Sequence, residues 1–485
     1  VSGTVDVSAN ATLTNTNTSN PTLCTLNATS TVVFNAAGAQ TVPIATYSNL
    51  SISNTGSSTA TAAGAIAVTS VLTVSSGSTF DMSTYALSGA ALTTSGTGTI
   101  KTQNTSATPL PTGKTWTMDV EYNGTGAQTI VTGTYNNVTL STARTSSPDI
   151  TLGSGTITIG NIFSVTATGV GSYVNTGNTV DFSKATTQTI PAINYLNITN
   201  TGNGVRTLAN GVIKIASTFT PGSSNYTIGT STVEFNGSAA QTIPVLPVAS
   251  GGNYYNLTYS GNSIGTLGGS ITVAGNFVQS AGNFQITSTS SASAVTLNVT
   301  GNVTLSNAAI LKLLNSTING ASATLNVTGN TTTSGSTSIF FETVNNSNAS
   351  GIAIFQTNDF TTTSIVSNII DFGISTVLGN EFRISGNFSK SGSGKFLTSS
   401  SSASTGFVFN KSGTQTFSYS GANSSNTQYV VNSGSTLQLL TSLTMGAYTN
   451  PTSTFKVIGT LDMGTNVISG TTDPTFTVNA GGTII

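Results

Sequence analysis

The chain has 485 residues, of which only 5% are charged, with 12 Lys and Arg, 13 Asp and Glu, and no His; ordinary soluble domains carry roughly 25% charged residues. Without His, the Ser-His-Asp and Cys-His triads and the usual zinc sites are excluded within this chain. A net charge of −1 gives no electrostatic reason to expect nucleic acid or an anionic membrane as a partner. Because the mean hydropathy is +0.15, we expect an ordered chain.

The single cysteine, Cys24, has no partner for an internal disulfide. It lies between Leu23 and Leu26, so we expect it to pack as a small hydrophobic side chain. A chain with few charges and many hydroxyl and amide side chains suits an exported protein. The chain begins at Val1 and ends at Ile485 without a polar capping unit, and we expect it to be part of something longer.

One phrase, an aromatic residue and Asn followed by Ala-Gln-Thr or a variant of it, occurs five times along the chain. It covers Phe34 to Pro43, Tyr122 to Ile130, Phe182 to Pro191, Phe235 to Pro244 and Phe409 to Phe417. A recurring unit of this kind indicates an array of repeats. We expect Phe34, Phe235 and Phe409 to point into the core, with Gln40, Gln241 and Gln415 at equivalent places in their units.

The recurring Asn and Gln side chains have a structural explanation. In stacked repeats an amide can donate to and accept from the amides above and below it, so Asn and Gln form ladders that satisfy turn backbone groups. The competing interpretation of the recurring aromatic residues is an exposed row that stacks on sugars. Its best candidates are Tyr254, Tyr255 and Tyr259.

Acidic residues are too scattered to suggest a catalytic constellation. Asp119 and Glu121 are the only close pair on one strand face, and their alternation with Met118, Val120 and Tyr122 places both outward. We therefore expect no catalytic residue, no cofactor and no metal site, and the chain is predicted not to be an enzyme.

A second phrase, ending in Gly-Asn, recurs at Ile271 to Phe277, Leu297 to Val303, Leu325 to Thr331 and Phe382 to Phe388. Its glycines are 26, 28 and 57 residues apart, which indicates a repeat of roughly 26 to 30 residues. Short strands of period two separated by Gly, Asn and Ser fit one rung of a parallel β-solenoid. The fold is therefore predicted to be all-β, an elongated parallel β-solenoid or β-helix in one or more subsegments. Residues 1–248 would carry the glutamine phrase, and residues 249–485 would continue with shorter Gly-Asn rungs.

These phrases carry a resemblance to a known class of proteins. Val233 to Ile243, then Asn253 to Tyr259, then Ile271 to Phe277 resemble the repetitive regions of large secreted surface proteins of Bacteroidetes, including gliding-motility adhesins and other type IX secretion cargo. The resemblance covers most of residues 30 to 465, and the C-terminal sorting domain that such cargo usually carries is absent from this sequence. What it implies is a filament or stalk on the cell exterior.

The expected function is an extracellular or cell-surface structural or adhesive segment of a large exported protein. Its expected partners are the export machinery and surface polysaccharide or other cell-surface proteins; no nucleic acid and no membrane insertion are expected. The alternatives are a carbohydrate-active β-helix enzyme, a sugar-binding module, or an ice-binding solenoid. An ice-binding surface would need Thr at one position of every rung, whereas these threonines are scattered around the repeat.

Overall fold

The chain folds into a parallel β-solenoid of about 19 turns with rungs of about 23 residues. The computed structural model describes residues 4–56, 58–249, 251–288, 290, 293–316, 318, 320–342, 352–372, 379–397, 406–421, 424–425, 427–446, 454–470 and 475–485. Within these ranges there are strands and turns but no helix. The all-β solenoid prediction is therefore confirmed.

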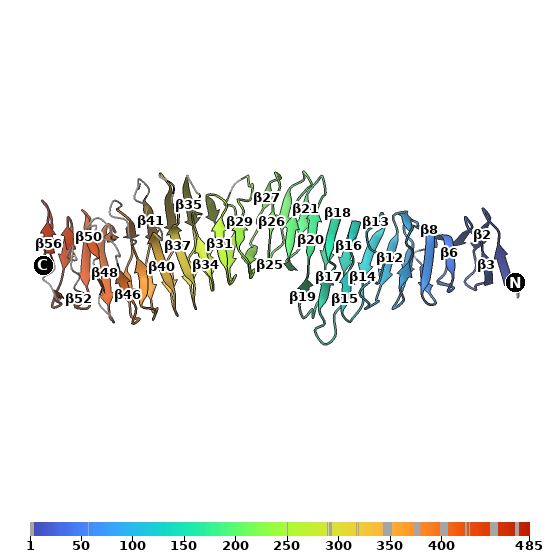
Figure 1. The fold of residues 1–485 in the computed structure, drawn as a ribbon, viewed down its shortest axis with the longest axis horizontal. Coiled ribbons are helices and arrows are strands. Elements are labelled where there is room, and N and C mark those ends of the chain that lie inside the picture. Colours follow the sequence, from blue (N-terminus) through green and yellow to red (C-terminus); the bar gives the residue numbers. More distant parts are fainter. Residues whose placement is uncertain are drawn as a thin grey trace. The chain divides into compact units, whose positions relative to one another are not determined.

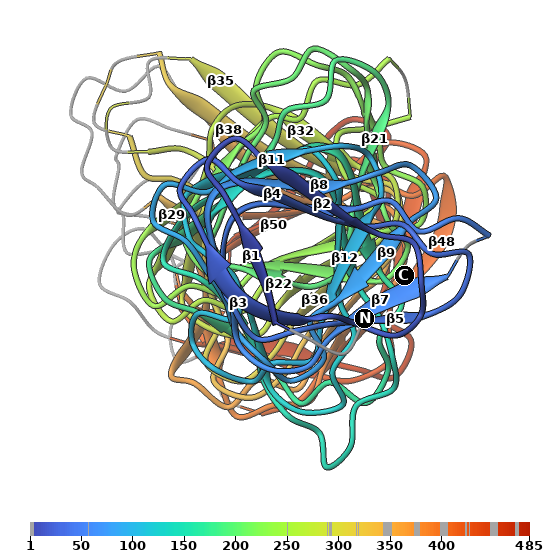
Figure 2. The same cartoon turned by 90° about the vertical axis from the view of Figure 1, so that its right-hand side faces the viewer.

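The chain divides into two compact units. The first comprises residues 1–209 and 220–227, and the second comprises residues 210–219 and 228–485. Figure 1 shows the strands of each unit stacked side by side in chain order. Figure 2 views the structure from its N-terminal end, where the first turns of the chain, in blue, form a closed coil. The change of phrase at residue 249 falls inside the second unit.

The first unit contains two longer sheets and three short ones. β16 is long enough to pair with both β13 and β14. The short sheets are β1 (Thr4–Val7) with β3 (Thr22–Leu26); β15 (Gln128–Ile130), β17 (Ile150–Leu152) and β19 (Tyr173–Asn175); and β21 (Gln188–Ile190), β24 (Arg206–Leu208) and β27 (Tyr226–Thr227). One longer sheet has β2 (Thr12–Asn15), β4 (Thr31–Phe34), β6 (Thr46–Ile52), β8 (Ile66–Val74), β10 (Leu87–Ser88) and β11 (Thr93–Ser95). The other has β5 (Gln40–Val42), β7 (Thr59–Ala62), β9 (Thr79–Asp81), β12 (Thr99–Thr102), β13 (Lys114–Trp116), β14 (Asp119–Tyr122), β16 (Gly133–Leu140), β18 (Gly155–Val165), β20 (Asn178–Phe182) and β23 (Asn197–Thr199). β22 (Asn194–Tyr195) also belongs to this unit, and β26 (Phe219–Thr220) lies where the residue ranges of the two units meet.

The second unit has three long parallel sheets, one for each side of the coil. The first has β25 (Val212–Ile215), β28 (Thr232–Phe235), β30 (Asn256–Tyr259), β33 (Phe277–Gln279), β36 (Val303–Leu305), β39 (Thr331–Thr333), β42 (Phe360–Thr362), β45 (Phe388–Lys390), β48 (Gly413–Tyr419), β51 (Ser435–Leu439), β54 (Thr460–Asp462) and β57 (Thr483–Ile484). The second has β29 (Gln241–Ile243), β31 (Ile264–Leu267), β34 (Asn283–Gln285), β37 (Ile310–Leu314), β40 (Ser338–Glu342), β43 (Asn368–Asp371), β46 (Lys395–Leu397), β49 (Ser424–Ser425), β52 (Leu443–Gly446) and β55 (Ile468–Gly470). The third has β32 (Ile271–Val273), β35 (Ala294–Val299), β38 (Ser322–Val327), β41 (Ala353–Thr357), β44 (Glu381–Ile384), β47 (Gly406–Phe409), β50 (Gln428–Val431), β53 (Thr454–Val457) and β56 (Thr475–Val478).

Rungs differ in length between the units, and their average of about 23 residues is near the predicted 26 to 30. In the first unit the register partners Thr59, Thr79, Thr99 and Asp119 follow one another at intervals of 20 residues. In the second unit, register steps around Leu297 and Leu325 are 26 and 28 residues. The Gly-Asn phrase, whose spacing supported the predicted length, recurs mainly among these longer rungs.

The core consists of inward side chains that stack from rung to rung. Phe34 is 1% exposed, and Phe235 and Phe409 are fully buried, which confirms their predicted placement. In the second unit six aromatic residues are successive register partners, and their rings stack in a column with centroid separations of 4.4 to 5.8 Å. This aromatic column is Phe355, Phe382, Phe407, Tyr429, Phe455 and Phe476.

Cys24 does not pack in the core: it is exposed in β3. Leu23 is half-buried, and the period-two alternation of a strand turns the next side chain to the opposite face. The prediction took the apolar neighbours of Cys24 as evidence of burial and overlooked this alternation.

Candidate functional site

The glutamine of the five-fold phrase is a buried clamp between two rungs. In each copy its Oε1 accepts the backbone N–H of the residue four positions earlier. Its Nε2 donates to a backbone carbonyl of the preceding rung. The residue that carries this carbonyl is the register partner of the aromatic residue that opens the phrase. The five residues are Gln40, Gln128, Gln188, Gln241 and Gln415, all 4% exposed or less. The most repeated feature of the sequence is therefore a device for holding rungs together.

Removing the clamp should destabilise its rung. In a Gln241→Leu variant, the Gly237 N–H and the carbonyls of Ile215 and Ser217 lose their side-chain partner. Each buried polar group left unpaired costs about 1–3 kcal/mol, so we expect a loss of at least that size. Hydrogen exchange of the amides around Gly237 measures it. Thr242→Ala, on the exposed next residue, is the matched control, and equal effects of the two substitutions would contradict the clamp.

A buried tyrosine completes the phrase in four of its copies. Tyr47, Tyr195 and Tyr254 donate their hydroxyls to the carbonyls of Pro43, Pro191 and Pro244 at 2.6–2.9 Å, and Tyr135 donates to Val131 in the same way. All four rings are buried. These tyrosines therefore serve the scaffold, and Tyr254 is one of the three sugar-stacking candidates.

The other two sugar-stacking candidates, Tyr255 and Tyr259, differ from each other in exposure. Tyr259 is fully buried, its ring packs 5.6 Å from that of Phe284, and burial raises its pKa to about 12. Tyr255 is half-buried at the surface. The structure therefore presents no exposed row of the three rings, and only Tyr255 keeps part of its side chain accessible.

The Gly-Asn phrase forms a ladder at one corner of the second unit. Each side-chain oxygen accepts the backbone N–H of the equivalent residue in the next rung at 2.6–3.2 Å, through Asn256, Asn276, Asn302, Asn330, Asp359, Asn387 and Thr416. A ladder thus exists as predicted, although all six of these steps join a side-chain oxygen to a backbone N–H and none joins two side-chain amides. The glycine before each asparagine of the phrase leaves space for the side-chain oxygen of the preceding rung. A Cβ on Gly301, for example, would lie 2.5 Å from Oδ1 of Asn276.

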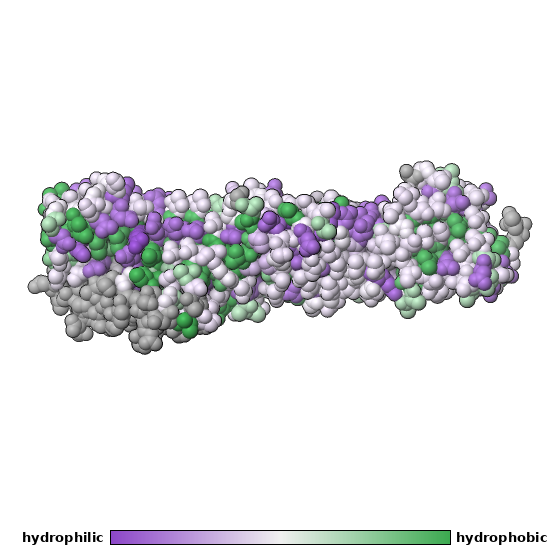
Figure 3. Space-filling model, turned by 90° about the horizontal axis from the view of Figure 1, so that it is seen from above, coloured by the Kyte–Doolittle hydropathy of each residue, from purple (hydrophilic) through white to green (hydrophobic). Residues whose placement is uncertain are grey.

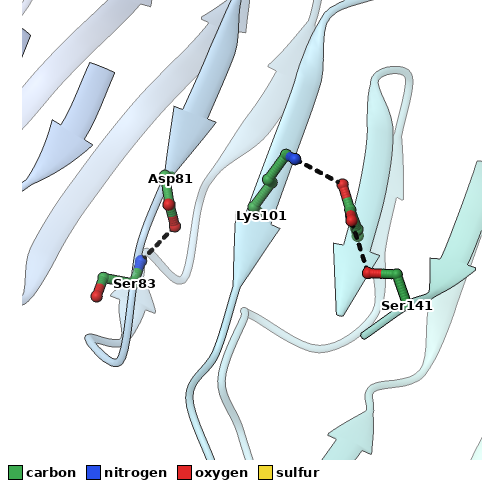
Figure 4. Close-up of polar contacts among 5 residues, drawn as sticks. Asp81, Ser83, Lys101 and Ser141 are labelled. Atoms are coloured by element: carbon green, nitrogen blue, oxygen red, sulfur yellow. Dashed lines mark hydrogen bonds and ion pairs between the residues drawn. The ribbon is translucent and has the colours of Figure 1, made fainter. Parts of the chain in front are cut away.

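An outward ion pair joins β12 and β14 in the first unit. As predicted, Asp119 and Glu121 face outward on β14, opposite buried Val120 and Tyr122. Lys101 lies 3.0 Å from Glu121, whose other oxygen accepts the hydroxyl of Ser141, as Figure 4 shows. In the second unit Lys214, Glu234 and Ser260 repeat this arrangement. Glu121 and Glu234 thus each bind a lysine and a serine hydroxyl, while Asp119 accepts a hydrogen bond from the amide of Asn137.

Three cations are buried, each held by backbone oxygens. The guanidinium of Arg206 donates to Asn200 Oδ1 and to the carbonyls of Phe182, Lys184, Thr186 and Gly204. Arg144 occupies the same position beneath the turn that holds Gln128. Lys390 donates to the carbonyls of Gly392 and Ser420, 4.5 Å from the ring centroid of Tyr419. These residues contribute to packing.

Burial lowers the pKa of Lys390 to about 8, and this gives a pH dependence. Between pH 8 and about 10.5 the unfolded chain holds a proton at this lysine that the folded chain releases, so stability rises with pH in that window. At 1.36 kcal/mol for each pKa unit, the gain is up to about 3 kcal/mol. Thermal unfolding of the wild type and Lys390→Met at pH 7.5 and 9.5 measures the difference. A pH-independent difference between the two proteins would contradict this prediction.

A hollow lies on the outer face of β44, β47, β50 and β53. It has a volume of about 650 Å³ and is lined by Glu381, Arg383, Val408, Asn410, Gln428, Val430, Asn432, Lys456 and Ile458; this set is named the outer hollow. Register pairing stacks Arg383, Val408, Val430 and Lys456 in one row. Long cationic side chains therefore stand at both ends of the row, and short valines form the floor between them.

Sequence reasoning missed the outer hollow. Glu381, Gly406 and Gln428 are register partners and form a second row beside that of Arg383. Because Gly406 has no side chain, this row has a gap between Glu381 and Gln428. Aligning the strands on Phe382, Phe407, Tyr429 and Phe455 would have found it, because this alignment also stacks the outward residues.

A second hollow, of about 500 Å³, lies in the first unit between β10 and β13 and is lined mainly by small and apolar residues. Its one ionisable residue, Lys114, donates to the carbonyl of Ala90. The outer hollow, with three ionisable residues, is therefore the better candidate for a functional site.

The three ionisable side chains of the outer hollow do not all lie close together. Nε of Arg383 lies 2.6 Å from Glu381 Oε2, whereas Lys456 is three rungs away, about 14 Å at the usual strand spacing. Among the described residues no group of three Asp, Glu, Cys or His could hold a metal ion. The arrangement suits binding across several rungs.

Comparisons with family models, with curated proteins and with solved structures give no match to this chain. No helix in the described part of the chain is long and apolar enough to cross a membrane.

Proposed function

We propose that the chain is an extracellular structural or adhesive segment, a filament or stalk, of a large exported surface protein. The observation that carries the proposal is the use of the repeated phrases. Their glutamines and asparagines hold adjacent rungs together, and their tyrosines fix the backbone within a rung, so the repeated sequence maintains a scaffold. A solenoid built in this way can be lengthened by adding rungs, which suits a part that spans distance at a cell surface.

The surface chemistry supports an adhesive role. The face visible in Figure 3 is mostly pale, with small separate hydrophilic and hydrophobic patches, as expected for outward Thr, Ser and Gly. Hydroxyl and amide arrays on stacked rungs can make many weak contacts, whose combined avidity increases with the number engaged. Type IX secretion and a gliding-adhesin role remain part of the proposal, supported by the resemblance of the repeated phrases.

Surface labelling tests the proposal. Antibodies against residues 1–485 should bind intact cells of the source organism, and external protease should remove the signal. A cytoplasmic protein of the same cells is the control. Labelling only after lysis would contradict export, and a change in attachment after deletion of these residues would separate an adhesive role from a purely structural one.

The enzymatic alternative has its own test. Purified chain incubated with acidic polysaccharides should release no new reducing ends, because the only acid of the outer hollow, Glu381, is paired with Arg383. Depolymerisation that Glu381→Gln abolishes would replace the filament with a carbohydrate-active enzyme.

A further inference from the structure

We propose that the outer hollow binds an oligosaccharide containing uronic acids, with sugar carboxylates held by Arg383 and Lys456. This inference rests on the proposed surface function and adds a ligand class and a site to it.

Lys456 of the outer hollow differs from two other outward lysines of the solenoid in its register partners. Lys101 and Lys214 each have a glutamate as register partner and form an ion pair with it. The register partners of Lys456 are Val430 and Thr477, and it forms no ion pair with any residue in the described ranges. Its ammonium group is therefore available to an anion.

At the other end, Arg383 uses Nε to bind Glu381. Its two terminal nitrogens make no hydrogen bond with the described part of the chain. These nitrogens form a planar pair that matches the two oxygens of a carboxylate. The outer hollow carries two cations and one acid, so its net charge is positive and an anionic ligand is favoured.

The floor and the flank suit a sugar chain. Val408, Val430 and Ile458 form short apolar surfaces for the C–H faces of sugar rings, while Gln428, Asn410 and Asn432 bring amides that can bond hydroxyl groups. The backbones of Arg383 and Lys456 are three strand spacings apart, about 14 Å, so a ligand that contacts both residues extends across several rungs. The lining contains no aromatic residue, so sugar rings would contact its aliphatic side chains and would not stack on an aromatic ring.

Calorimetric titration of the full 485-residue chain with hexagalacturonate tests the proposal. The fully methyl-esterified hexamer is the ligand control, because it keeps the sugar backbone and removes the charges. We expect binding of the acid form that weakens with added salt, and at least 10-fold weaker binding of the ester. Equal binding of the two oligomers, or no binding of either, would overturn the proposal.

Protein variants locate the site. Arg383→Gln and Lys456→Gln should each weaken binding by about 5- to 10-fold, since each removes one charged contact. Lys312→Gln, which removes a half-buried outward lysine on a different sheet of the same unit, should leave it unchanged. Binding that all three variants retain would overturn this assignment. A chain that is displayed on cells yet binds no oligogalacturonate would lose this inference and keep the proposed function.

Discussion

Replacing Phe382 with alanine is expected to lower the stability of the surrounding rungs by about 3–5 kcal/mol, as Phe-to-Ala substitutions in packed cores do. Phe382 lies inside the aromatic column, 4.4 Å from the ring of Phe355 and 5.5 Å from that of Phe407, and its ring also meets Phe360 edge-on at 4.9 Å. The cavity left by the ring would remove contacts with the two adjacent rungs. Hydrogen exchange of amides in β41, β44 and β47 measures the local loss.

Phe382→Leu provides the control, because it keeps an apolar side chain of similar reach. We expect it to recover more than half of the loss. Rungs contact only their neighbours in a solenoid, so amides in the first unit should exchange at the wild-type rate. A Phe382→Ala loss below about 1 kcal/mol, or uniform destabilisation of both units, would contradict the account of the column.

Replacing Arg206 with methionine should cost a similar amount in the first unit. Arg206 is fully buried, and its guanidinium is the donor for four carbonyl oxygens and one amide oxygen. Burial lowers its pKa, but a guanidinium stays protonated in proteins. Methionine fills part of the volume and leaves the oxygens without this donor, so we expect a loss of about 3–5 kcal/mol. Thermal unfolding together with hydrogen exchange around Phe182 measures it.

Arg206→Lys separates charge from shape. A lysine keeps the positive charge but has three donors and no planar fork, so it should recover only part of the stability. Full recovery by lysine would show that charge alone matters. An Arg206→Met protein as stable as the wild type would contradict the role of these hydrogen bonds.

The repeat and the strand alternation made the fold predictable, because both depend on local sequence. Alternation alone does not say which face is inward, yet the size of Phe34 and Phe235 identified it correctly. Cys24 shows the limit, since its apolar neighbours suggested burial and its strand position exposes it.

The roles of polar residues were less predictable. Nε2 of Gln40 donates to a carbonyl 25 residues earlier, and the equivalent donor of Gln415 reaches one 31 residues earlier. Such partners emerge only once the register of each rung is known, because rung lengths vary. The outer hollow has the same origin: Arg383 and Lys456 lie on one surface only because three register steps bring them there.

The asparagine ladder also bears on how such a chain can change over evolution. Successive members of the ladder are separated by 20, 26, 28, 29, 28 and 29 residues, yet each makes the same contact with the next rung. A difference of nine residues between the shortest and the longest step is therefore absorbed elsewhere in the rung. Insertions and deletions opposite the ladder can thus be tolerated without a register shift, and new surface loops can be acquired there one rung at a time.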